Sequence, residues 1–358
     1  MTKLFYALLC ILSLPLCAAE KVAKKTEYII GCNVSKSEVT TGLFKVCNRK
    51  PELVREYNIA TDKITDFAQY MVPLIKKINE ENNITVKRAC FAAPGNTNAQ
   101  KNCIKAPHLT FVVDGVAIEN GSSIEKALVV NDFETVGFGI QAINPKEIVT
   151  LHEGKPRAKG TQVIVGAGNG LGSGLMLWDA ASQSYMPSPL SYSFVDFTAE
   201  TELELKLYHY LQKHTESHSW GKVLGASGGI LRIYDFLDQQ KLKEYKSAAQ
   251  QYEQYTDVFA HRNDDERCAD AVALYMKLYA RLVRNVAYAQ LPYNGLYITN
   301  TVAEKYPELF KDPNFLKEMF NTGNQYLLDY LKEIPVYLAT HPKIQLYGAA
   351  QYLLVYDR

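Results

Sequence analysis

Charge of neither sign is in excess in this sequence of 358 residues. Its 39 Lys and Arg residues and 38 Asp and Glu residues leave a formal net charge of +1. Proteins that bind nucleic acid or anionic membranes by electrostatics carry a clear surplus of positive charge. The charge balance therefore predicts that nucleic acid and anionic membrane surfaces are not partners.

Long apolar runs are also missing after the first 20 residues. A helix that spans a bilayer needs about 20 consecutive apolar residues, and no later segment has that length. We therefore expect no stable membrane span. Repeats of solenoid length and low-complexity linkers are absent too, so a solenoid architecture is excluded.

Metal-binding cysteine patterns are lacking as well. The sequence has no CxxC and no Cys/His cluster at zinc spacing, so no metal site is predicted. Five cysteines follow the first 20 residues, and two interpretations of them stay open. One is two disulfides, Cys90–Cys103 and Cys32–Cys47, with Cys268 as a free thiol. The other is five unpaired, mostly buried thiols.

The N-terminal segment has the layout of a secretory signal peptide. A short basic start, Met1–Lys3, precedes the apolar run Leu4–Leu16, and Cys17–Ala19 places small residues before a cleavage point. Residues 1–19 are therefore predicted to be a signal peptide that exports the protein to a periplasm or out of the cell. A buried N-terminal strand or helix is the alternative.

The remaining sequence has the composition of a globular protein, with 47% hydrophobic and 22% charged residues. Short apolar strands alternate with amphipathic helical stretches, a pattern typical of α/β folds. The expected strands are 27–31, 41–46, 87–93, 127–130, 161–165, 296–299 and 335–339. The expected helices are 65–79, 199–214 and 239–290, the last with a break near 263–265. The length allows a smaller lobe, 27–135, and a larger lobe, 136–358, whose C-terminal segment crosses back.

Three stretches occur in a distinctive order. Val129–Phe133 is a strand that ends in Asn-Asp-Phe, and Val165–Gly174 is a strand that runs into a glycine-rich loop. Glu333–His341 is a late strand, and the start of a last helix follows at Leu346–Ala350. Together they resemble the bacterial-type glucokinase family, in which the second stretch is the second phosphate loop and the third is the closing strand. The resemblance covers about residues 28–354. It implies a two-lobed actin-like ATPase (sugar kinase) fold with a cleft between the lobes, and a homodimer.

The resemblance also implies an activity, which is phosphorylation of glucose or a related hexose by ATP and Mg²⁺. Asp132 corresponds to the general base, and Asn131 to a residue that hydrogen-bonds a sugar hydroxyl. Open α/β sheets place ligands at strand ends, where these residues are expected. Without the resemblance, the sequence favours Asp132 as the cap of a following helix over a catalytic role.

The resemblance also implies that residues of the glycine run bind phosphate. These residues are Gly166, Gly168, Asn169, Gly170 and Gly172. Glycine lets backbone N–H groups approach phosphate oxygens without a clash with Cβ. The alternative is a tight hairpin that needs positive φ angles and binds nothing.

Several positions depart from the family pattern. The first phosphate loop, Asp-x-Gly-Gly-Thr-Asn, corresponds here to Asn33–Glu38, so the metal-organising carboxylate is an amide and a Glu stands where it would repel a triphosphate. The sugar-gripping Glu-Gly-Gly-His corresponds to Ser191–Phe194, and a further Glu to Gly221. The adenosine-side Gly-Gly corresponds to Asn300–Thr301.

Two functional hypotheses follow. The first is an active hexose kinase that uses ATP and Mg²⁺. The second is an exported, non-catalytic relative that binds a sugar, a nucleotide or an unknown protein partner in the inherited cleft or on its surface.

Overall fold

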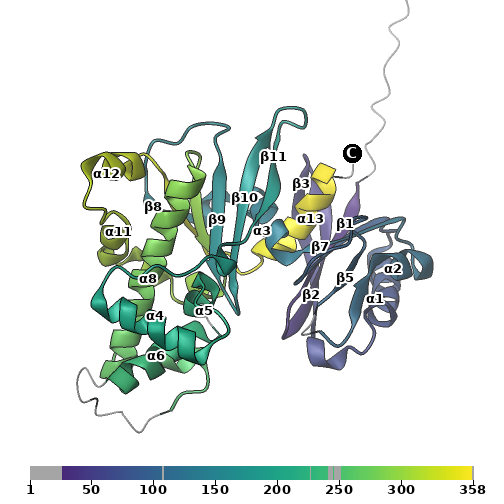
Figure 1. Cartoon of the computed structure of the whole chain (residues 1–358). Helices are drawn as coiled ribbons and strands as arrows, with labels where there is room; N and C mark the ends of the chain where they lie inside the picture. The colour runs from purple at the N-terminus through teal and green to yellow at the C-terminus, as the bar shows by residue number, and fades with distance from the viewer. Residues whose placement is uncertain (1–25, 107–108, 226, 241–244, 246–250, 357–358) are drawn as a thin grey trace, which may run out of the picture.

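The computed structural model describes residues 26–106, 109–225, 227–240, 245 and 251–356, which form two α/β lobes side by side (Figure 1). The predicted signal peptide, 1–19, lies outside the described residues. None of the described helices is long and apolar enough to cross a membrane.

The smaller lobe is built on a five-stranded sheet with the order β3-β2-β1-β4-β7. The first three strands form an antiparallel meander, and the last two run parallel to the first. In chain order the strands are β1 (Tyr28–Val34), β2 (Glu38–Cys47), β3 (Lys50–Ala60), β4 (Arg88–Ala93) and β7 (Lys126–Asn131). A separate small sheet pairs β5 (Cys103–Lys105) with β6 (Val112–Asp114).

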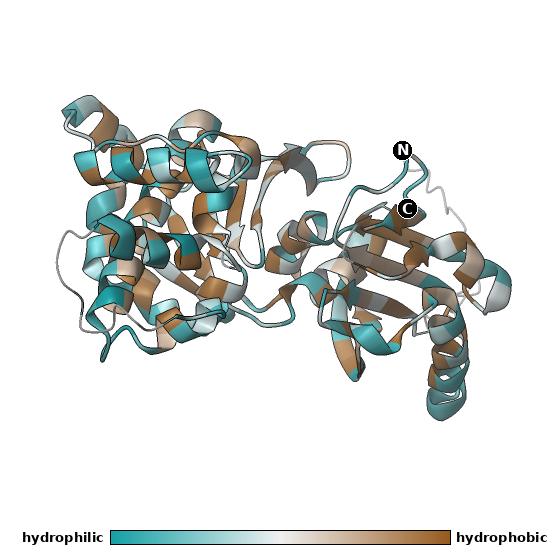
Figure 2. Cartoon of the chain, turned by 60° about the horizontal axis from the view of Figure 1, so that its bottom comes forward, coloured by the Kyte–Doolittle hydropathy of each residue, from teal (hydrophilic) through white to brown (hydrophobic). Residues whose placement is uncertain are grey.

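Helices cover both faces of this sheet. On one face, α1 (Phe67–Asn82) and α2 (Gly115–Gly121) enclose one core, and on the other, α3 (Asp132–Ala142) and α13 (Ile344–Tyr356) enclose a second. Strand β1 is apolar on both faces up to Cys32 for this reason, because its alternate residues Ile30 and Ile29 enter different cores. The outward faces of the helices are mostly hydrophilic (Figure 2).

The larger lobe carries a six-stranded sheet with the order β11-β10-β9-β12-β13-β8. Its strands are β8 (Ile148–His152), β9 (Gln162–Ala167), β10 (Leu171–Asp179), β11 (Ser184–Leu190), β12 (Leu296–Thr299) and β13 (Val336–Ala339). Its longer helices are α4 (Glu202–His214), α6 (Gly229–Gln240), α8 (Glu266–Gln290) and α12 (Gln325–Lys332). Shorter helices are α5 (Trp220–Leu224), α7 (Tyr255–Ala260), α9 (Thr301–Lys305), α10 (Pro307–Lys311) and α11 (Pro313–Met319).

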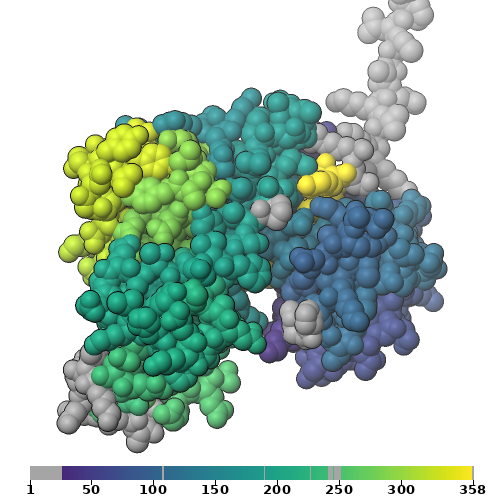
Figure 3. All heavy atoms as spheres, in the orientation of Figure 1, coloured from purple at the N-terminus to yellow at the C-terminus, as the bar shows by residue number. Residues whose placement is uncertain are grey.

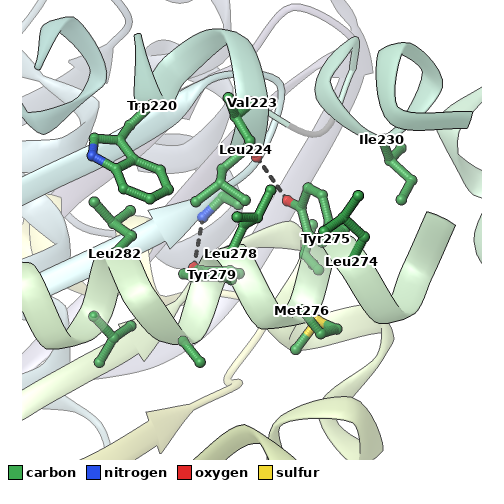
Figure 4. Packing of buried hydrophobic residues seen from close by; sticks show 14 of the residues in the cluster. Trp220, Val223, Leu224, Ile230, Leu274, Tyr275, Met276, Leu278, Tyr279 and Leu282 are labelled. Carbon is green, nitrogen blue, oxygen red and sulfur yellow. Dashed lines mark hydrogen bonds between the residues drawn. The ribbon is translucent and has the colours of Figure 1, made fainter. Parts of the chain in front are cut away.

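Helix α8 lies at the centre of the larger lobe's core (Figure 4). It begins where Asp265 accepts hydrogen bonds from the N–H groups of Arg267 and Cys268, which confirms the predicted break near 263–265. Two of its buried tyrosines reach neighbouring segments: the Tyr275 hydroxyl donates to the Leu224 carbonyl at 2.7 Å, and the Tyr279 hydroxyl accepts from the Ala167 N–H at 3.1 Å. Helix α8 therefore holds the end of β9 in place.

We expect Tyr279→Phe to lower the free energy of unfolding by about 1–3 kcal/mol, because it leaves the buried Ala167 N–H without its hydrogen-bond acceptor. Denaturant titration measures the loss. Tyr326→Phe, at a position that is 79% exposed, is the matched control and should change nothing. Equal stability of the two variants would show that the hydroxyl of Tyr279 does not support β9.

The chain passes between the lobes after α3 and again before α13, so these two helices form the junction. They pack against each other, and α13 also packs on β1 and β4 of the smaller lobe. The predicted lobe boundary at 135/136 falls inside α3, and the C-terminal helix lies on the smaller lobe's sheet (Figure 1).

The predicted disulfides are not formed. Cys32, Cys47, Cys90, Cys103 and Cys268 are all free. Cys32 lies opposite Thr41 in the β1–β2 pair, whereas Cys47 lies beyond the residue opposite Tyr28, which separates them by roughly 20 Å of strand. Cys90 enters the core beneath α13, while Cys103 lies in β5. Burial raises the pKa of the Cys32 thiol to about 12, so it is an inert thiol.

Candidate functional site

A cavity of about 490 Å³ lies between the lobes. In the space-filling view a gap separates teal residues of the larger lobe from blue residues of the smaller lobe (Figure 3). The β1–β2 turn, the segments after β4 and β7, the β9–β10 hairpin, the ends of β11 and β12 and the start of α13 all reach the cavity. Its polar lining includes Ser35, Lys36, Asn96, Asn131, Asp132, Asn169, Asn300 and Gln345.

Asn131 and Asp132 both line this cavity, but they have different local roles. The Asn131 side chain caps α3, since its oxygen accepts from the N–H groups of Phe133 at 2.9 Å and Glu134 at 3.3 Å, and its amide donates to the Gly95 carbonyl at 2.9 Å. The alternative that Asp132 is the cap is therefore wrong. Asp132 is the first residue of α3, where the helix dipole favours a carboxylate.

The glycine run forms a β-hairpin. Gly166 belongs to β9 and Gly172 to β10, and the turn consists of Gly168, Asn169 and Gly170. None of these glycines has a positive φ, so that part of the hairpin alternative is wrong. Asn169, Gly170 and Gly172 line the cavity, whereas Gly166 and Gly168 lie against Asn300.

Packing explains one of these glycines directly. A Cβ at Gly172 would lie 2.2 Å from the ring of Phe133, so the strand must carry glycine there for the ring to pack on it. The Asn-Asp-Phe motif and the glycine run are therefore in contact. A Cβ at Gly170 would meet nothing within 4 Å, which leaves the hairpin tip open toward the cavity.

The β1–β2 turn, which corresponds to the first phosphate loop, is closed on itself. The Ser35 hydroxyl oxygen accepts from the N–H groups of Ser37 at 3.3 Å and Glu38 at 3.0 Å, and the hydroxyl donates to the Glu38 carbonyl at 2.8 Å. These backbone donors are already engaged within the turn. Lys36, beside them, lines the cavity with an exposed side chain.

Asn33 stands where the resemblance implies a metal-organising carboxylate. Its amide donates to the side-chain oxygen of Gln345 at 3.2 Å, in a half-buried contact between β1 and α13. Mg²⁺ is usually held through one or two carboxylates, and a neutral amide that is already paired does not fit that role. Among the described residues, no group of three or more His, Cys, Asp or Glu side chains could hold a metal.

The residues of this chain that correspond to the sugar-binding motif, Ser191–Phe194, are also uncharged. Ser191 lines the cavity, while Phe194 is 82% exposed. A Cβ at Gly221, where a carboxylate is implied, would lie 2.7 Å from the Ser193 carbonyl. The backbone of the substituted motif therefore closes the space that a Glu side chain at this position would need.

Two residues of the site, Glu134 and Gln345, were not predicted from the sequence. Glu134 lines the cavity and pairs with Lys101 at 3.2 Å, and Lys101 also donates to the Tyr352 hydroxyl. Gln345 enters from α13, 312 residues away from its partner Asn33. The sequence did offer a signal for Gln345, because Gln345 and Gln351 are the two carboxamides in an otherwise apolar terminal helix.

Asn300 keeps a backbone conformation suited to glycine. Its φ of 75° and ψ of −177° lie in a region that only glycine adopts readily, and its side chain caps α9 by accepting from the Thr301 N–H at 2.9 Å. This is a position where the resemblance implies glycine. The backbone of this chain at Asn300 is therefore one that a glycine would adopt without strain.

We expect Asn300→Gly to stabilise the protein by about 1 kcal/mol. Relief of a strain of about 1–3 kcal/mol outweighs the lost cap, which costs a few tenths when glycine replaces Asn, and the greater freedom of the unfolded chain. Asn300→Ala is the control: it keeps the strain, loses the cap and should lower the melting temperature. A lower melting temperature for Asn300→Gly would contradict this account.

Comparison with known proteins identifies the family of the chain. A family model described as Glucokinase matches residues 39–355. The glucokinase of Nostoc sp. is 30% identical over 300 residues, which is 78% of this chain and 86% of that protein. The glucokinase of Nostoc punctiforme is 29% identical over 299 residues, with the same shares covered.

Solved structures agree with this fold. The glucokinase from an Antarctic psychrotroph matches with a TM-score of 0.79 at 17% identity, over 93% of this chain and 99% of that one. A Balamuthia mandrillaris glucokinase in complex with glucose matches at 0.71 and 13%, over 94% and 95%. A ROK family glucokinase from Streptomyces griseus, in complex with glucose and AMPPNP, matches at 0.57 and 13%, over 91% and 98%. The chain belongs to the glucokinase family of sugar kinases, with their two-lobed actin-like ATPase fold.

Proposed function

We propose that this chain binds a sugar in its interlobe cleft but transfers phosphate from ATP to glucose or a related hexose very slowly or not at all. Hexose phosphorylation needs a base beside the sugar hydroxyl and an electropositive, metal-assisted cradle for the nucleotide phosphates. The cleft keeps a carboxylate, Asp132, for the first requirement. The part of the cleft that would meet the second requirement, the cradle for the nucleotide phosphates, has changed.

The observation that carries this proposal is the closed β1–β2 turn. The Ser35 hydroxyl occupies the N–H groups of Ser37 and Glu38, so these donors are not free for a phosphate oxygen. The carboxylate of Glu38 adds negative charge beside the turn, which disfavours a triphosphate. Asn33, paired with Gln345, offers no anionic ligand to Mg²⁺.

We expect no hexose-dependent turnover of ATP·Mg²⁺ above background in a coupled assay with a panel of hexoses at high enzyme concentration. Asp132→Ala should have the same background rate. The competing hypothesis is an active kinase with Asp132 as base, which the position of Asp132 in the cleft favours. Turnover that is abolished by Asp132→Ala would establish that hypothesis and overturn this one.

Restoring the carboxylate and the two glycines of the family pattern in the β1–β2 turn, with Ser37 and Glu38 kept, should restore part of the nucleotide binding. In thermal-shift measurements we expect ATP·Mg²⁺ to leave the melting temperature of the natural chain unchanged and to raise that of Asn33→Asp/Ser35→Gly/Lys36→Gly, because a ligand stabilises only the state that binds it. Sugars should shift both proteins. An equal shift of both proteins by ATP·Mg²⁺ would contradict the proposal, and no shift with any sugar would favour a protein partner instead.

We also propose that the protein is exported through residues 1–19. The basic start, apolar run and small residues before Ala19 support this proposal. N-terminal sequencing of the protein purified from its native host should begin at Glu20. A mature protein that begins at Met1 or Thr2 would overturn it.

A further inference from the structure

The interlobe cavity is continuous from the sugar side of the cleft to the nucleotide side. One cavity of about 490 Å³ contacts Asn131 and Asp132, the tip of the β9–β10 hairpin at Asn169, and the end of β12 at Asn300. That volume is within the range of small-molecule sites. A ligand longer than one hexose can therefore extend along the cavity without crossing a protein wall.

About half of the wall of this cavity is polar, and most of its polar side chains are uncharged. Five carboxamides line it, together with five hydroxyl side chains. The carboxamides are Asn96, Asn131, Asn169, Asn300 and Gln345, and the hydroxyls belong to Ser35, Ser173, Ser188, Ser191 and Thr301. Carboxamides and hydroxyls can both donate and accept hydrogen bonds. This dual capacity matches sugar hydroxyls, whereas phosphate oxygens only accept.

The lining carries three charged side chains, one cation, Lys36, and two carboxylates, Asp132 and Glu134. Glu134 is paired with Lys101, which lies outside the lining. A triphosphate brings several negative charges that this wall does not neutralise. The electrostatics of the cleft therefore favour a neutral ligand on the nucleotide side as well as on the sugar side.

Some of the lining groups have hydrogen-bonding capacity to spare. In the described part of the chain, the side chains of Asn96, Asn169, Ser188 and Ser191 have no protein hydrogen-bond partner, although all four line the cavity. They come from three separate segments: the turn after β4, the β9–β10 hairpin and the end of β11. The same cavity is also lined by apolar side chains such as Phe133, which suit the C–H faces of sugar rings.

We infer that the cleft takes a neutral oligosaccharide of two or more hexose units, one end at Asn131 and Asp132 and the other over the β9–β10 hairpin near Asn300. This inference rests on the proposed sugar-binding function. Contacts along several units replace the charged groups that a glucokinase uses to hold a single hexose. The nucleotide side of the cleft thereby becomes part of a longer sugar site.

Isothermal titration of the purified protein with glucose and with malto- and cello-oligosaccharides of two to four units tests this inference. We expect affinity to rise at least tenfold from glucose to the trisaccharide of one series, with ATP·Mg²⁺ binding more weakly than that trisaccharide. Asn169→Ala should weaken the trisaccharide at least fivefold and leave glucose binding unchanged. Asn314→Ala, on α11 and away from the cleft, is the matched control and should change neither.

The outcomes of these titrations distinguish the oligosaccharide inference from the sugar-binding proposal on which it rests. If glucose binds and added units give no gain, or if Asn169→Ala has no effect on the longer sugars, the oligosaccharide inference fails and the sugar-binding proposal stands. If no sugar of any length binds, both fail. If ATP·Mg²⁺ binds more tightly than every sugar, the neutral cleft is the wrong description of this site.

Discussion

Replacing Gly348 by Ala should destabilise the protein by about 3 kcal/mol, the upper end of what overpacking usually costs. A Cβ at this position of α13 would lie 1.9 Å from the Thr135 carbonyl of α3, and a Cβ at Gly139 of α3 would lie 2.0 Å from the Ile344 carbonyl. Both obstacles are backbone atoms, which cannot rotate away. The helices must move apart, and these are the helices at which the chain passes between the lobes.

Denaturant unfolding measures this loss, and Gly139→Ala should give a similar result. Gly174→Ala is the matched control, because a Cβ there would lie 3.7 Å from the Phe133 ring, an ordinary contact. We also expect small-angle scattering of Gly348→Ala to show a changed separation of the lobes. Stability equal to that of Gly174→Ala would show that the α3–α13 contact tolerates a wider spacing.

The sequence predicted the interior strands of both sheets better than the edge strands. The interior strands β4, β9, β12 and β13 appear as short apolar runs because neighbouring layers bury them, and the edge strand β7 was also predicted because four of its six residues are buried. β3, β8 and β11 are edge strands and were missed. Edge strands tolerate what interior strands exclude: β3 carries charged residues, and β11 contains Pro187 and Pro189, which lack the N–H that an interior ladder requires. β10 was missed because its glycines indicated a loop.

The candidate site was predictable where it depended on strand ends. Asn131 and Asp132 end one buried strand and the glycine hairpin follows another, so their meeting in one cleft follows from the fold class. The closed β1–β2 turn was not predictable, because it depends on the rotamer of Ser35. The Asn33–Gln345 bond was not predictable either, since it requires the last helix to return to the smaller lobe.

A buried ion-pair network joins three helical segments of the larger lobe. Glu204 of α4 is fully buried, and its carboxylate contacts Arg281 of α8 and, at 3.2 Å, Lys277. The Arg281 guanidinium, itself only 3% exposed, also contacts Glu200 at 3.0 Å and Glu318 of α11 at 3.2 Å. Arg281 thus contacts three carboxylates, of which Glu204 is fully buried, while Lys277 and Arg284 supply further positive charge to Glu204 and Glu200.

Arg281→Met should therefore lower the free energy of unfolding by about 3–5 kcal/mol, because it leaves the fully buried Glu204 carboxylate without its guanidinium partner and with Lys277 alone. Arg55→Met is the matched control: Arg55 pairs with Glu81 at 2.9 Å on an exposed surface, and its loss should have little effect. The double variant Glu204→Met/Arg281→Met should recover part of the stability, since it removes a buried charge together with its partner. If Arg281→Met is as stable as Arg55→Met, the network contributes nothing.

The pH dependence of this loss identifies its electrostatic origin. Burial would raise the pKa of the Glu204 carboxyl, but the hydrogen bond and charge of Arg281, a backbone N–H and the charge of Lys277 outweigh it and lower the pKa below the ordinary value. The stabilisation is then complete above the unfolded-state pKa of about 4.3 and is lost as the pH falls through the lower folded-state pKa.

In Arg281→Met the burial of Glu204 has no guanidinium to offset it, so acid no longer destabilises that side chain. The stability gap between the natural protein and Arg281→Met should be widest near neutral pH and narrow below about pH 4.3. A gap that stays constant from neutral pH to well below the unfolded-state pKa of about 4.3 would assign the loss to packing of the arginine side chain instead.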